Sequence, residues 1–475
     1  MQTAKKPTWS KAISQPAREF PITNLKIISG KIPPGLRGTL YRNGSARLER
    51  GGIHVGHWFD GDGAILAVHF HPDGSATGVY RYVQTQGYQA ESQAGKLLYS
   101  NYGMTAPGAV WNNWFKPVKN AANTSVLALP DKLLALWEGG KPHYLDLQEL
   151  NTLGEDNLGE LTDKTPYSAH PKVDGMTGEI FNFGITPGKN ATLNVYRSNM
   201  SGNIKQKNAH KLDGTPLVHD FVLAGQYLVF VISPVQLQLL PALIGFKSFS
   251  EAMTWEPELG TQILVIDRQT LEIVSRIQTE PWYQWHFANG YVDDSGIIII
   301  DIAKYSDFQT NQYLKEFATG QTHTLATSSL SRVHINPQKG EVTQISELLD
   351  RHCEFPSVPP QHVGQKSDYT YLSIAQPGTD MSKEILNGIA CLDHNTETLT
   401  EANIGTDIYP SEPIYVNDAD DPNQGWVLTV IFDGSSECSE VWIFNTQKLD
   451  EEPTCKLGLP SIIPPGFHGT WTSFV

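Results

Sequence analysis

Short runs of β-branched and aromatic residues, each ended by a polar turn, dominate the pattern of hydrophobic and polar positions along the chain. Residues 265–268 (VIDR) and 391–394 (CLDH) are two examples. Such runs, separated by Gly, Asp, Asn and Pro, are typical of strands joined by tight turns. Stretches with the 3.6-residue periodicity of amphipathic helices are scarce. The pattern therefore predicts an all-β protein.

An apolar run followed by a polar turn recurs at seven places, with turns expected at residues 71, 146, 198, 267, 336, 393 and 445. Their intervals of about 50–75 residues suit a four-stranded blade with long loops. A closed ring of blades also leaves no sheet edge exposed. We therefore predict a seven-bladed β-propeller, with loops and short helices capping one face. A string of ordinary hairpins in a large sandwich is the alternative.

The N-terminal segment, residues 1–36, lacks this pattern and ends in the sequence IPPGL. We expect it to form an irregular strap along the protein. The strand-and-turn signal begins after it, so residues 37–475 are expected to form a single propeller domain.

Two segments interrupt the strand pattern. Residues 111–119 combine tryptophans with lysines, and residues 234–249 (PVQLQLLPALIGFKSF) are apolar without strand alternation. Both are too short to span a bilayer, but Trp, Lys and apolar side chains together suit the lipid interface. We expect peripheral membrane contact here. Buried helices packed over the propeller face are an equally good interpretation.

Composition narrows the choice of partner and compartment. A net charge of −15 leaves no basic surplus to neutralise phosphates, so we expect no nucleic-acid partner. The four cysteines form no CxxC pair, and the N-terminus lacks the apolar run of a signal peptide. No apolar run reaches the about 20 residues of a membrane-spanning helix. We therefore expect a cytoplasmic protein, with membrane contact only at its surface.

Four histidines lie in similar surroundings, in or next to apolar and aromatic sequence: His170, His219, His286 and His468. Each alone would more often be a core histidine than a metal ligand. Their spacings, however, fit whole numbers of blades, and the inner strand of each blade can direct one side chain at the central axis. Imidazole suits Zn, Cu, Fe and Ni, and the lack of thiolates argues against a structural zinc.

Three glutamates are placed to support these histidines from behind: Glu138, Glu354 and Glu412. A ligating histidine usually donates its second N–H to a carboxylate, which fixes the tautomer. For any one glutamate alone, a surface position is the more frequent outcome. The sequence thus predicts a metal site on the axis, under the capping face.

Ten motifs, in order along nearly the whole chain, resemble the carotenoid cleavage oxygenases, and the bacterial apocarotenoid oxygenases are the most similar branch. They are IPPGLRGTLYRNG (32–44), HWFDGDG (57–63), KNAANTS (119–125), LLALWEGGKPH (133–143), SAHPK (168–172), VHDF (218–221), HFANGY (286–291), CEFP (353–356), SEPIYV (411–416) and FHGTW (467–471). The resemblance implies a seven-bladed propeller with non-haem Fe(II) on its axis.

By motif, the resemblance makes the four histidines iron ligands and the three glutamates their supports. It places Thr124 beside a vacant coordination position. It assigns five aromatic residues to a substrate tunnel: Phe59, Trp137, Trp285, Tyr305 and Phe355. Some relatives carry a second histidine where this chain has Phe287, but the ligand itself is retained.

The implied reaction is cleavage of a polyene C=C bond by O2 to give two carbonyl products. Central 15,15' cleavage of an apocarotenal to retinal is preferred, and eccentric cleavage, for example at 9,10, of a full-length carotenoid is the alternative. Relatives that cleave hydroxystilbenes tend to carry a lysine where this chain has Trp137, and an indole favours a polyene over a phenolate. A propeller that binds a ligand without catalysis is the remaining hypothesis.

Overall fold

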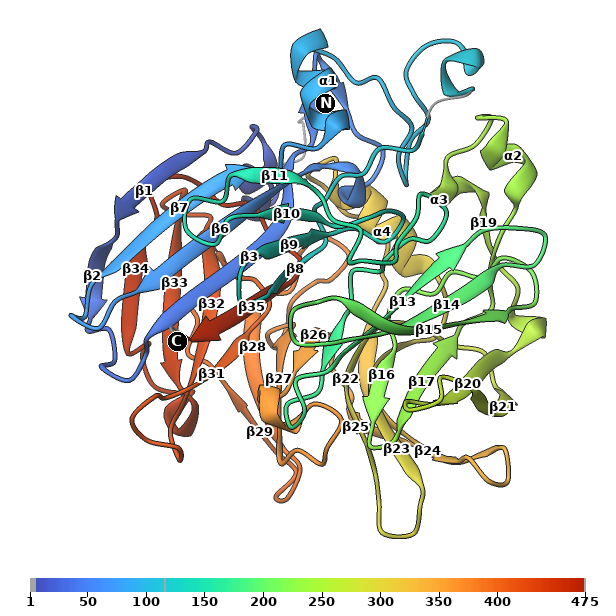
Figure 1. Ribbon diagram of the computed structural model, residues 1–475. Helices are drawn as coiled ribbons and strands as arrows, with labels where there is room; N and C mark the ends of the chain where they lie inside the picture. Colours follow the sequence, from blue (N-terminus) through green and yellow to red (C-terminus); the bar gives the residue numbers. More distant parts are fainter. Residues whose placement is uncertain (1–5, 115–116, 474–475) are drawn as a thin grey trace.

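The computed structural model describes residues 6–114 and 117–473, and sheets make up most of it (Figure 1). The described residues form five sheets of four to six strands, one sheet of eight strands and two strand pairs. The large sheets are arranged in a propeller-like manner, with the longer helices gathered at one end (Figure 1, top). The all-β prediction is confirmed.

Three sheets are built mainly from strands within residues 20–211, and within each the strands are named in their spatial order. The first holds β1 (Phe20–Asn24), β7 (Ala76–Tyr82), β6 (Asp62–Phe70), β3 (Gly38–Arg47) and β35 (Gly469–Ser473). The second holds β11 (Thr152–Glu155), β10 (His143–Leu145), β9 (Leu133–Leu136) and β8 (Ser125–Ala128). The third holds β12 (Lys172–Val173), β13 (Ile180–Thr186), β14 (Thr192–Ser198) and β15 (Ile204–Lys211).

The other three large sheets follow. The eight-stranded sheet holds β21 (Ile273–Thr279), β20 (Thr261–Asp267), β17 (Tyr227–Ile232), β16 (Val222–Ala224), β22 (Tyr283–Val292), β23 (Ile298–Tyr305), β24 (Ser328–Asn336) and β25 (Glu341–Leu349). The next holds β26 (Cys353–Ser357), β27 (Tyr369–Ile374), β28 (Gly388–Asp393) and β29 (Thr398–Glu401). The last holds β2 (Lys26–Gly30), β34 (Cys455–Gly458), β33 (Cys438–Asn445), β32 (Gly425–Asp433) and β30 (Ile408–Pro410), with β31 (Ile414–Asn417) also on β32.

The smaller elements connect and cover these sheets. The strand pairs are β4 (Glu49–Arg50) with β5 (Ile53–His54) and β18 (Val235–Leu237) with β19 (Met253–Trp255). The α-helices are α1 (Gln86–Ala94), α2 (Leu239–Leu243), α3 (Phe249–Ala252) and α4 (Gln309–Phe317). The 3-10 turns are η1 (Thr8–Ile13), η2 (Trp58–Asp60), η3 (Val110–Asn113), η4 (Pro257–Leu259), η5 (Pro360–His362) and η6 (Thr446–Lys448).

The prediction of seven separate blades is wrong as stated, because two groups of four strands share one sheet. β16 and β22 run parallel and pair at Ala224 and Gly290. This pairing joins the meander that ends in β21 to the one that ends in β25. A glycine at the junction suits the close approach, since an added Cβ would lie 3.0 Å from the Ala224 Cβ. The sequence pattern indicates the individual hairpins, but it does not indicate this long-range contact between β16 and β22.

All seven predicted turns lie between or at the ends of paired strands. Asp146, Asp267, Asn336 and Asp393 accept backbone N–H groups two and three residues ahead through their side chains. Such Asx turns explain why polar residues end these apolar runs. The repeat seen in the sequence is thus a repeat of hairpins.

The N-terminal segment is not the irregular strap that we expected. Its strand β1 pairs with β7, and β2 pairs with β34 near the C-terminus. The last strand, β35, pairs in turn with β3. Strands β1 and β35 from the two ends of the chain therefore belong to the same sheet, while β2 joins the sheet of β32–β34 (Figure 1).

Hydrophobic clusters fill the space between adjacent sheets. One joins Leu40 and Leu66 of the first sheet to Leu428 and Ile443 of the sixth. Strand β6 is buried along its whole length, since it has a sheet on either side. Packing sheets face to face in this way gives a rigid frame, and the strand ends and loops at its centre can hold side chains in fixed positions.

Candidate metal centre

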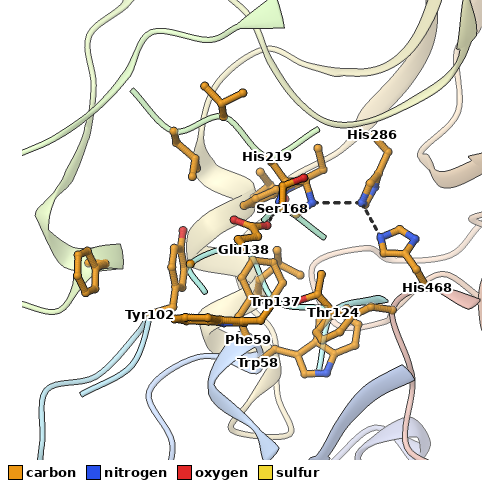
Figure 2. A pocket seen from close by; sticks show the side chains of 18 of the residues that line it. Trp58, Phe59, Tyr102, Thr124, Trp137, Glu138, Ser168, His219, His286 and His468 are labelled. Carbon is orange, nitrogen blue, oxygen red and sulfur yellow. Dashed lines mark hydrogen bonds and ion pairs between the residues drawn. The ribbon is translucent and has the colours of Figure 1, made fainter. Parts of the chain in front are cut away.

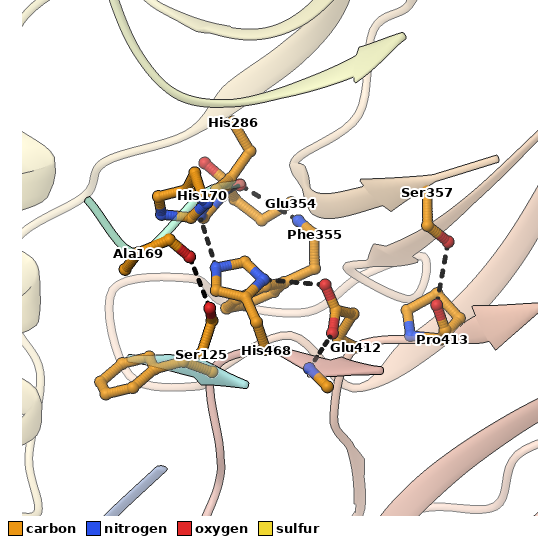
Figure 3. Close-up of polar contacts among 12 residues, drawn as sticks. Ser125, Ala169, His170, His286, Glu354, Phe355, Ser357, Glu412, Pro413 and His468 are labelled. Carbon is orange, nitrogen blue, oxygen red and sulfur yellow. Dashed lines mark hydrogen bonds and ion pairs between the residues drawn. The ribbon is translucent and has the colours of Figure 1, made fainter. Parts of the chain in front are cut away.

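Four histidine side chains from different parts of the chain converge in the middle of the protein. His286 Nε2 lies 3.4 Å from His219 Nε2 and 3.1 Å from His468 Nε2. The His170 ring centroid lies 4.4 Å from that of His219 and 4.8 Å from that of His468. Figures 2 and 3 show the rings facing a common point. The structure thus brings together all four histidines selected from the sequence.

Different elements carry the four rings. His286 lies within β22, at a place where the pairing with β23 is irregular. His170, His219 and His468 lie in loops just before β12, β16 and β35. The His170 loop is fixed by Ser125 Oγ, which donates to the Ala169 carbonyl at 2.5 Å (Figure 3). Loops on a rigid sheet frame are common positions for ligand-binding side chains.

The geometry fits a single metal ion. Two imidazole nitrogens that each lie about 2.1 Å from one ion are roughly 3.0 to 3.4 Å apart for angles between 90° and 109°. The two measured Nε2–Nε2 distances fall in this range. His170 Nε2 is buried and has no hydrogen-bond partner among the described residues. Nitrogen donors without thiolate or carboxylate suit a transition metal rather than Ca²⁺ or Mg²⁺.

Three carboxylates contact the outer nitrogens of three of the rings, and two of them accept hydrogen bonds there. Glu354 Oε2 lies 2.6 Å from His286 Nδ1, and Glu412 Oε1 lies 2.8 Å from His468 Nδ1. Glu138 makes the same close contact with His219 Nδ1. A proton held on Nδ1 leaves the Nε2 lone pair directed at the centre. All three glutamates predicted to support the histidines therefore contact one each.

The pKa shifts follow from this pairing. Burial alone would lower the pKa of His286, but the Glu354 carboxylate outweighs burial and raises it. Burial would raise the pKa of Glu354, whereas His286 and the Tyr305 hydroxyl, 2.8 Å from Oε1, bring it below the usual value. Glu354 is thus an anion inside the protein, and its charge offsets the charge that a bound metal ion would bring.

His170 differs from the other three because no glutamate among the described residues forms an ion pair or a hydrogen bond with its ring. Burial, with smaller effects from the other three histidines, lowers its pKa well below the ordinary value. Its Nδ1 lies 3.9 Å from Asp220 Oδ1, an oxygen that also accepts from Lys172 Nζ at 2.8 Å. The partly neutralised Asp220 therefore takes the place behind this ring that a glutamate has behind the others.

Phe355 contacts the same imidazole as its neighbour Glu354, although adjacent strand residues normally point to opposite faces. Its ring stacks on His286 at 5.2 Å between centroids and meets His468 at 5.3 Å. The pairing of β26 with β27 shifts between Glu354 and Ser357, and Phe355 has φ +51°. This bulge and left-handed backbone turn both side chains toward the metal centre.

A cavity of about 640 Å³ opens onto the centre, and it is lined mainly by apolar and aromatic side chains (Figure 2). The five aromatic residues expected to line a substrate tunnel all border it. The Phe59 and Trp285 rings both pack on His219, and Trp285 Nε1 donates to Thr310 Oγ1 at 3.0 Å. The Tyr305 hydroxyl donates a hydrogen bond to Glu354 Oε1. Such a lining excludes water and suits an elongated apolar ligand.

Thr124 also borders the cavity, beside His468 (Figure 2). Its carbonyl accepts the His468 N–H at 3.1 Å, and its hydroxyl donates to Asn123 Oδ1 at 3.1 Å. The hydroxyl is therefore fixed, and the methyl group is held in one orientation as well. The structure thus places Thr124 next to His468.

The sequence analysis did not identify the charged side chains that pair with the carboxylates around the metal centre. Arg42, almost fully buried in β3, donates to Glu412 Oε2 at 3.0 Å and to the Phe467 carbonyl at 3.0 Å. Burial of an arginine requires a charged or carbonyl partner. Arg42 stands in an apolar strand of the IPPGLRGTLYRNG motif, and this placement was the available signal. Asp220 and Lys172 likewise stood inside recognised motifs without an assigned role.

The two segments that were expected to contact a membrane lie side by side. Trp114 Nε1 donates to the Ile244 carbonyl at 3.0 Å, joining the segment after η3 to α2. Exposed apolar side chains gather on both, including Trp111 (66%), Leu240 (71%), Leu243 (69%) and Phe246 (75%). The alternative of buried helices is therefore wrong for α2. Phe115 and Lys116 lie outside the described residues.

Lys119 does not belong to the exposed surface, because it is buried between Asp62 and Glu91. No helix within residues 6–114 and 117–473 is long and apolar enough to cross a membrane. Four residues that line the cavity lie within or next to these two segments in the sequence: Val118, Leu237, Phe249 and Met253.

Comparisons with known proteins agree with this arrangement. The family model described as "Retinal pigment epithelial membrane protein" matches residues 13–473. Apocarotenoid-15,15'-oxygenase of Synechocystis is 33% identical over 94% of this chain and 92% of its own, and resveratrol cleavage oxygenase 1 of Aspergillus fumigatus is 27% identical over 95% and 93%. The crystal structure of cobalt-substituted Synechocystis apocarotenoid oxygenase superimposes with a TM-score of 0.91 at 31% identity, over 98% of both chains. The chain belongs to the carotenoid cleavage oxygenase family.

Proposed function

We propose that the protein is a non-haem Fe(II) dioxygenase that cleaves one C=C bond of a carotenoid or apocarotenoid polyene into two carbonyl products. The preferred reaction is central 15,15' cleavage of an apocarotenal to retinal. The observation that carries the proposal is a site of four imidazole nitrogens opening on an apolar cavity of about 640 Å³. Eccentric cleavage of a full-length carotenoid would use the same site, with the polyene shifted along the cavity so that another double bond lies near the metal.

The four histidines would hold the iron, and Glu138, Glu354 and Glu412 would fix their tautomers and balance the ion's charge. When bound, Fe(II) would supply O2 activation, for which amino-acid side chains have no equivalent. The protein's own tasks are to hold the double bond near the metal and to keep water out. Such a reaction requires no general base, and the cavity wall near the histidines is largely aromatic.

Individual side chains have separate roles in this proposal. The fixed Thr124 methyl group would narrow the space beside His468. Phe59, Trp137 and Trp285 would contact the polyene, while Phe355 and Tyr305 would chiefly hold His286 and Glu354 in place. The contacts of the Phe355 ring with His286 and of the Tyr305 hydroxyl with Glu354 support this division.

Hydroxystilbene cleavage is the second candidate, because a resveratrol cleavage oxygenase is among the relatives. Trp137, which borders the cavity, stands where stilbene-cleaving relatives tend to carry a lysine. Its indole cannot pair with a phenolate as an ammonium can. This difference favours the polyene.

We further propose that the exposed apolar surface of η3 and α2 rests on a lipid membrane. Trp and Leu side chains at this level of exposure are typical of an interfacial anchor. The cavity-lining residues that adjoin these segments in sequence would let an apolar substrate pass from lipid into the cavity without crossing water.

The direct test incubates Fe(II)-loaded protein under air with an apocarotenal and, separately, with a hydroxystilbene, and identifies products by mass. Aldehydes from the polyene alone are expected, and their masses give the bond that is cut. Cleavage of the stilbene alone would show that Trp137 has been misinterpreted. Turnover of neither substrate by metal-verified protein would favour a ligand-binding propeller.

A further inference from the structure

Two side chains on the cavity wall, those of Ser373 and His352, each present a polar atom that no described residue contacts by a hydrogen bond, and neither belongs to the metal centre. Ser373 lies on β27 and borders the cavity; it is 1% exposed, and its Oγ has no hydrogen-bond partner among the described residues. His352, just before β26, borders the same cavity. Unsatisfied buried hydroxyls are rare and call for an explanation, such as a ligand that completes them.

Strand pairing places both groups on one face of the sheet. Glu354 is directly opposite Ser373, and the Ala375 N–H donates to the His352 carbonyl at 2.9 Å, which sets these two opposite each other as well. Because side chains alternate along a strand, His352 and Ser373 point to the same side as Glu354. Diagonal neighbours of this kind are roughly 7–8 Å apart at Cα. One ligand atom between them can therefore contact both.

The tautomer of His352 follows from its other nitrogen. The Ser328 backbone N–H donates to His352 Nδ1 at 3.0 Å, so Nδ1 carries no proton. Burial lowers the pKa of His352 to about 4, which keeps the ring neutral with its proton on Nε2. No described residue accepts from Nε2. The cavity thus has an N–H donor and an O–H donor on one face of the sheet, beside the Glu354 carboxylate, which already accepts from His286 and Tyr305.

We propose that His352 and Ser373 form a polar subsite that binds the oxygen atom at one terminus of the polyene substrate. The two donors match the two lone pairs of a carbonyl oxygen, and a ring hydroxyl can accept from His352 while donating to Ser373. Because Glu354 lies opposite Ser373 and also holds His286, the anchored oxygen stands at a fixed distance from the metal centre. The subsite therefore selects oxygen-terminated polyenes and helps to set which double bond reacts. This inference rests on the proposed polyene-cleaving function.

The test compares three polyenes of matched length: an apocarotenal with an unsubstituted ring, a ring-hydroxylated polyene without the aldehyde, and the hydrocarbon that lacks both oxygens. Dissociation constants are measured on metal-free protein by quenching of tryptophan fluorescence. Ser373→Ala removes the hydroxyl without breaking any protein hydrogen bond. His352→Asn keeps an acceptor for the Ser328 N–H but removes the Nε2–H donor. Each variant is expected to weaken the oxygen-terminated ligand by about 3- to 10-fold, and the hydrocarbon is expected to bind unchanged.

The control variant is Thr370→Val on the same strand, whose hydroxyl contacts His394 on the other face and does not border the cavity. It should bind all three polyenes like the native protein. A loss confined to the aldehyde identifies a carbonyl subsite, and a loss confined to the ring alcohol identifies a hydroxyl subsite. Equal affinities of both variants for oxygen-terminated and hydrocarbon polyenes would overturn the inference.

A second readout separates this inference from the proposed function. A bound aldehyde that accepts two hydrogen bonds should show a lowered C=O stretching frequency in the Raman spectrum, restored toward the free value in Ser373→Ala. If the native protein shows the shift, Ser373→Ala loses it and the native protein cleaves no polyene, the result supports the subsite and rejects the function. Cleavage of polyenes by a protein whose C=O frequency is the same in native and variant forms supports the function and rejects the subsite.

Discussion

Replacing Glu354 by Gln is the sharpest perturbation of the metal centre that leaves its shape intact. Both Glu354 oxygens act as acceptors, one from His286 Nδ1 at 2.6 Å and from the Phe355 N–H at 3.1 Å, the other from Tyr305 at 2.8 Å. An amide retains only one acceptor oxygen and carries no charge. The variant therefore weakens the bond that fixes the His286 tautomer and removes a negative charge beside the ion.

The size of the effect follows from the type of bond that is lost. A hydrogen bond to a charged group contributes about 1.5–3 kcal/mol, against about 0.5–1.5 kcal/mol for a neutral one. Loss of a partner behind a ligating histidine typically reduces metal affinity by about 10- to 100-fold. For Glu354→Gln we expect a loss in this range, because the side chain is only 7% exposed and water cannot replace it. Glu138 is 31% exposed, so Glu138→Gln should lose less.

The assay is an anaerobic equilibrium titration of Fe(II), and of Co(II) as a spectroscopic substitute, against a chelator of known affinity. Tyr305→Phe is the control, since it removes one neutral donor from Glu354 and leaves the carboxylate charged. Its affinity should fall by no more than about 3-fold. Unchanged affinity in Glu354→Gln, or a larger loss in Glu138→Gln, would refute the reasoning.

Three further predictions test other parts of the account. His286→Ala should lose bound metal and turnover together, as measured by elemental analysis and product formation; full activity at native metal content would remove His286 from the site. Arg42→Met leaves the buried Glu412 carboxylate without its cation, so urea unfolding should show a loss of about 3–5 kcal/mol, and native stability would mean that Glu412 is neutral. Serine at Leu240 and Leu243 should reduce sedimentation with liposomes while turnover of detergent-dispersed substrate continues, and undiminished sedimentation would place the membrane contact elsewhere.

Periodic local features of the fold were readable from the sequence. At Asp146, Asp267, Asn336 and Asp393 the turn residue accepts backbone N–H groups through its own side chain, and that chemistry is local. The paired strands of the N-terminal segment and the shared eight-stranded sheet could not be predicted from the sequence. β1, β2 and the β16–β22 contact depend on partners far away in the chain, and local composition does not encode such pairings.

For the site, the histidines and glutamates could be chosen from their residue types and aromatic neighbours, and the structure brings these side chains together. Which glutamate serves which histidine could not be chosen, since it depends on how the sheets are arranged around the centre. The bulge at Phe355 and the buried Arg42 also escaped prediction. The Arg42 contact forms only when strands far apart in the sequence meet, and the bulge depends on how β26 pairs with β27.

The measurement that tests the central claim most directly is the isotopic composition of products formed from one apocarotenal under ¹⁸O2. The aldehydes are reduced to alcohols as they form, so that exchange with water does not erase the label. A dioxygenase should give two fragments from a single double bond, each carrying one ¹⁸O atom. Label in only one fragment, or no cleavage by protein with a full complement of iron, would contradict the proposed function.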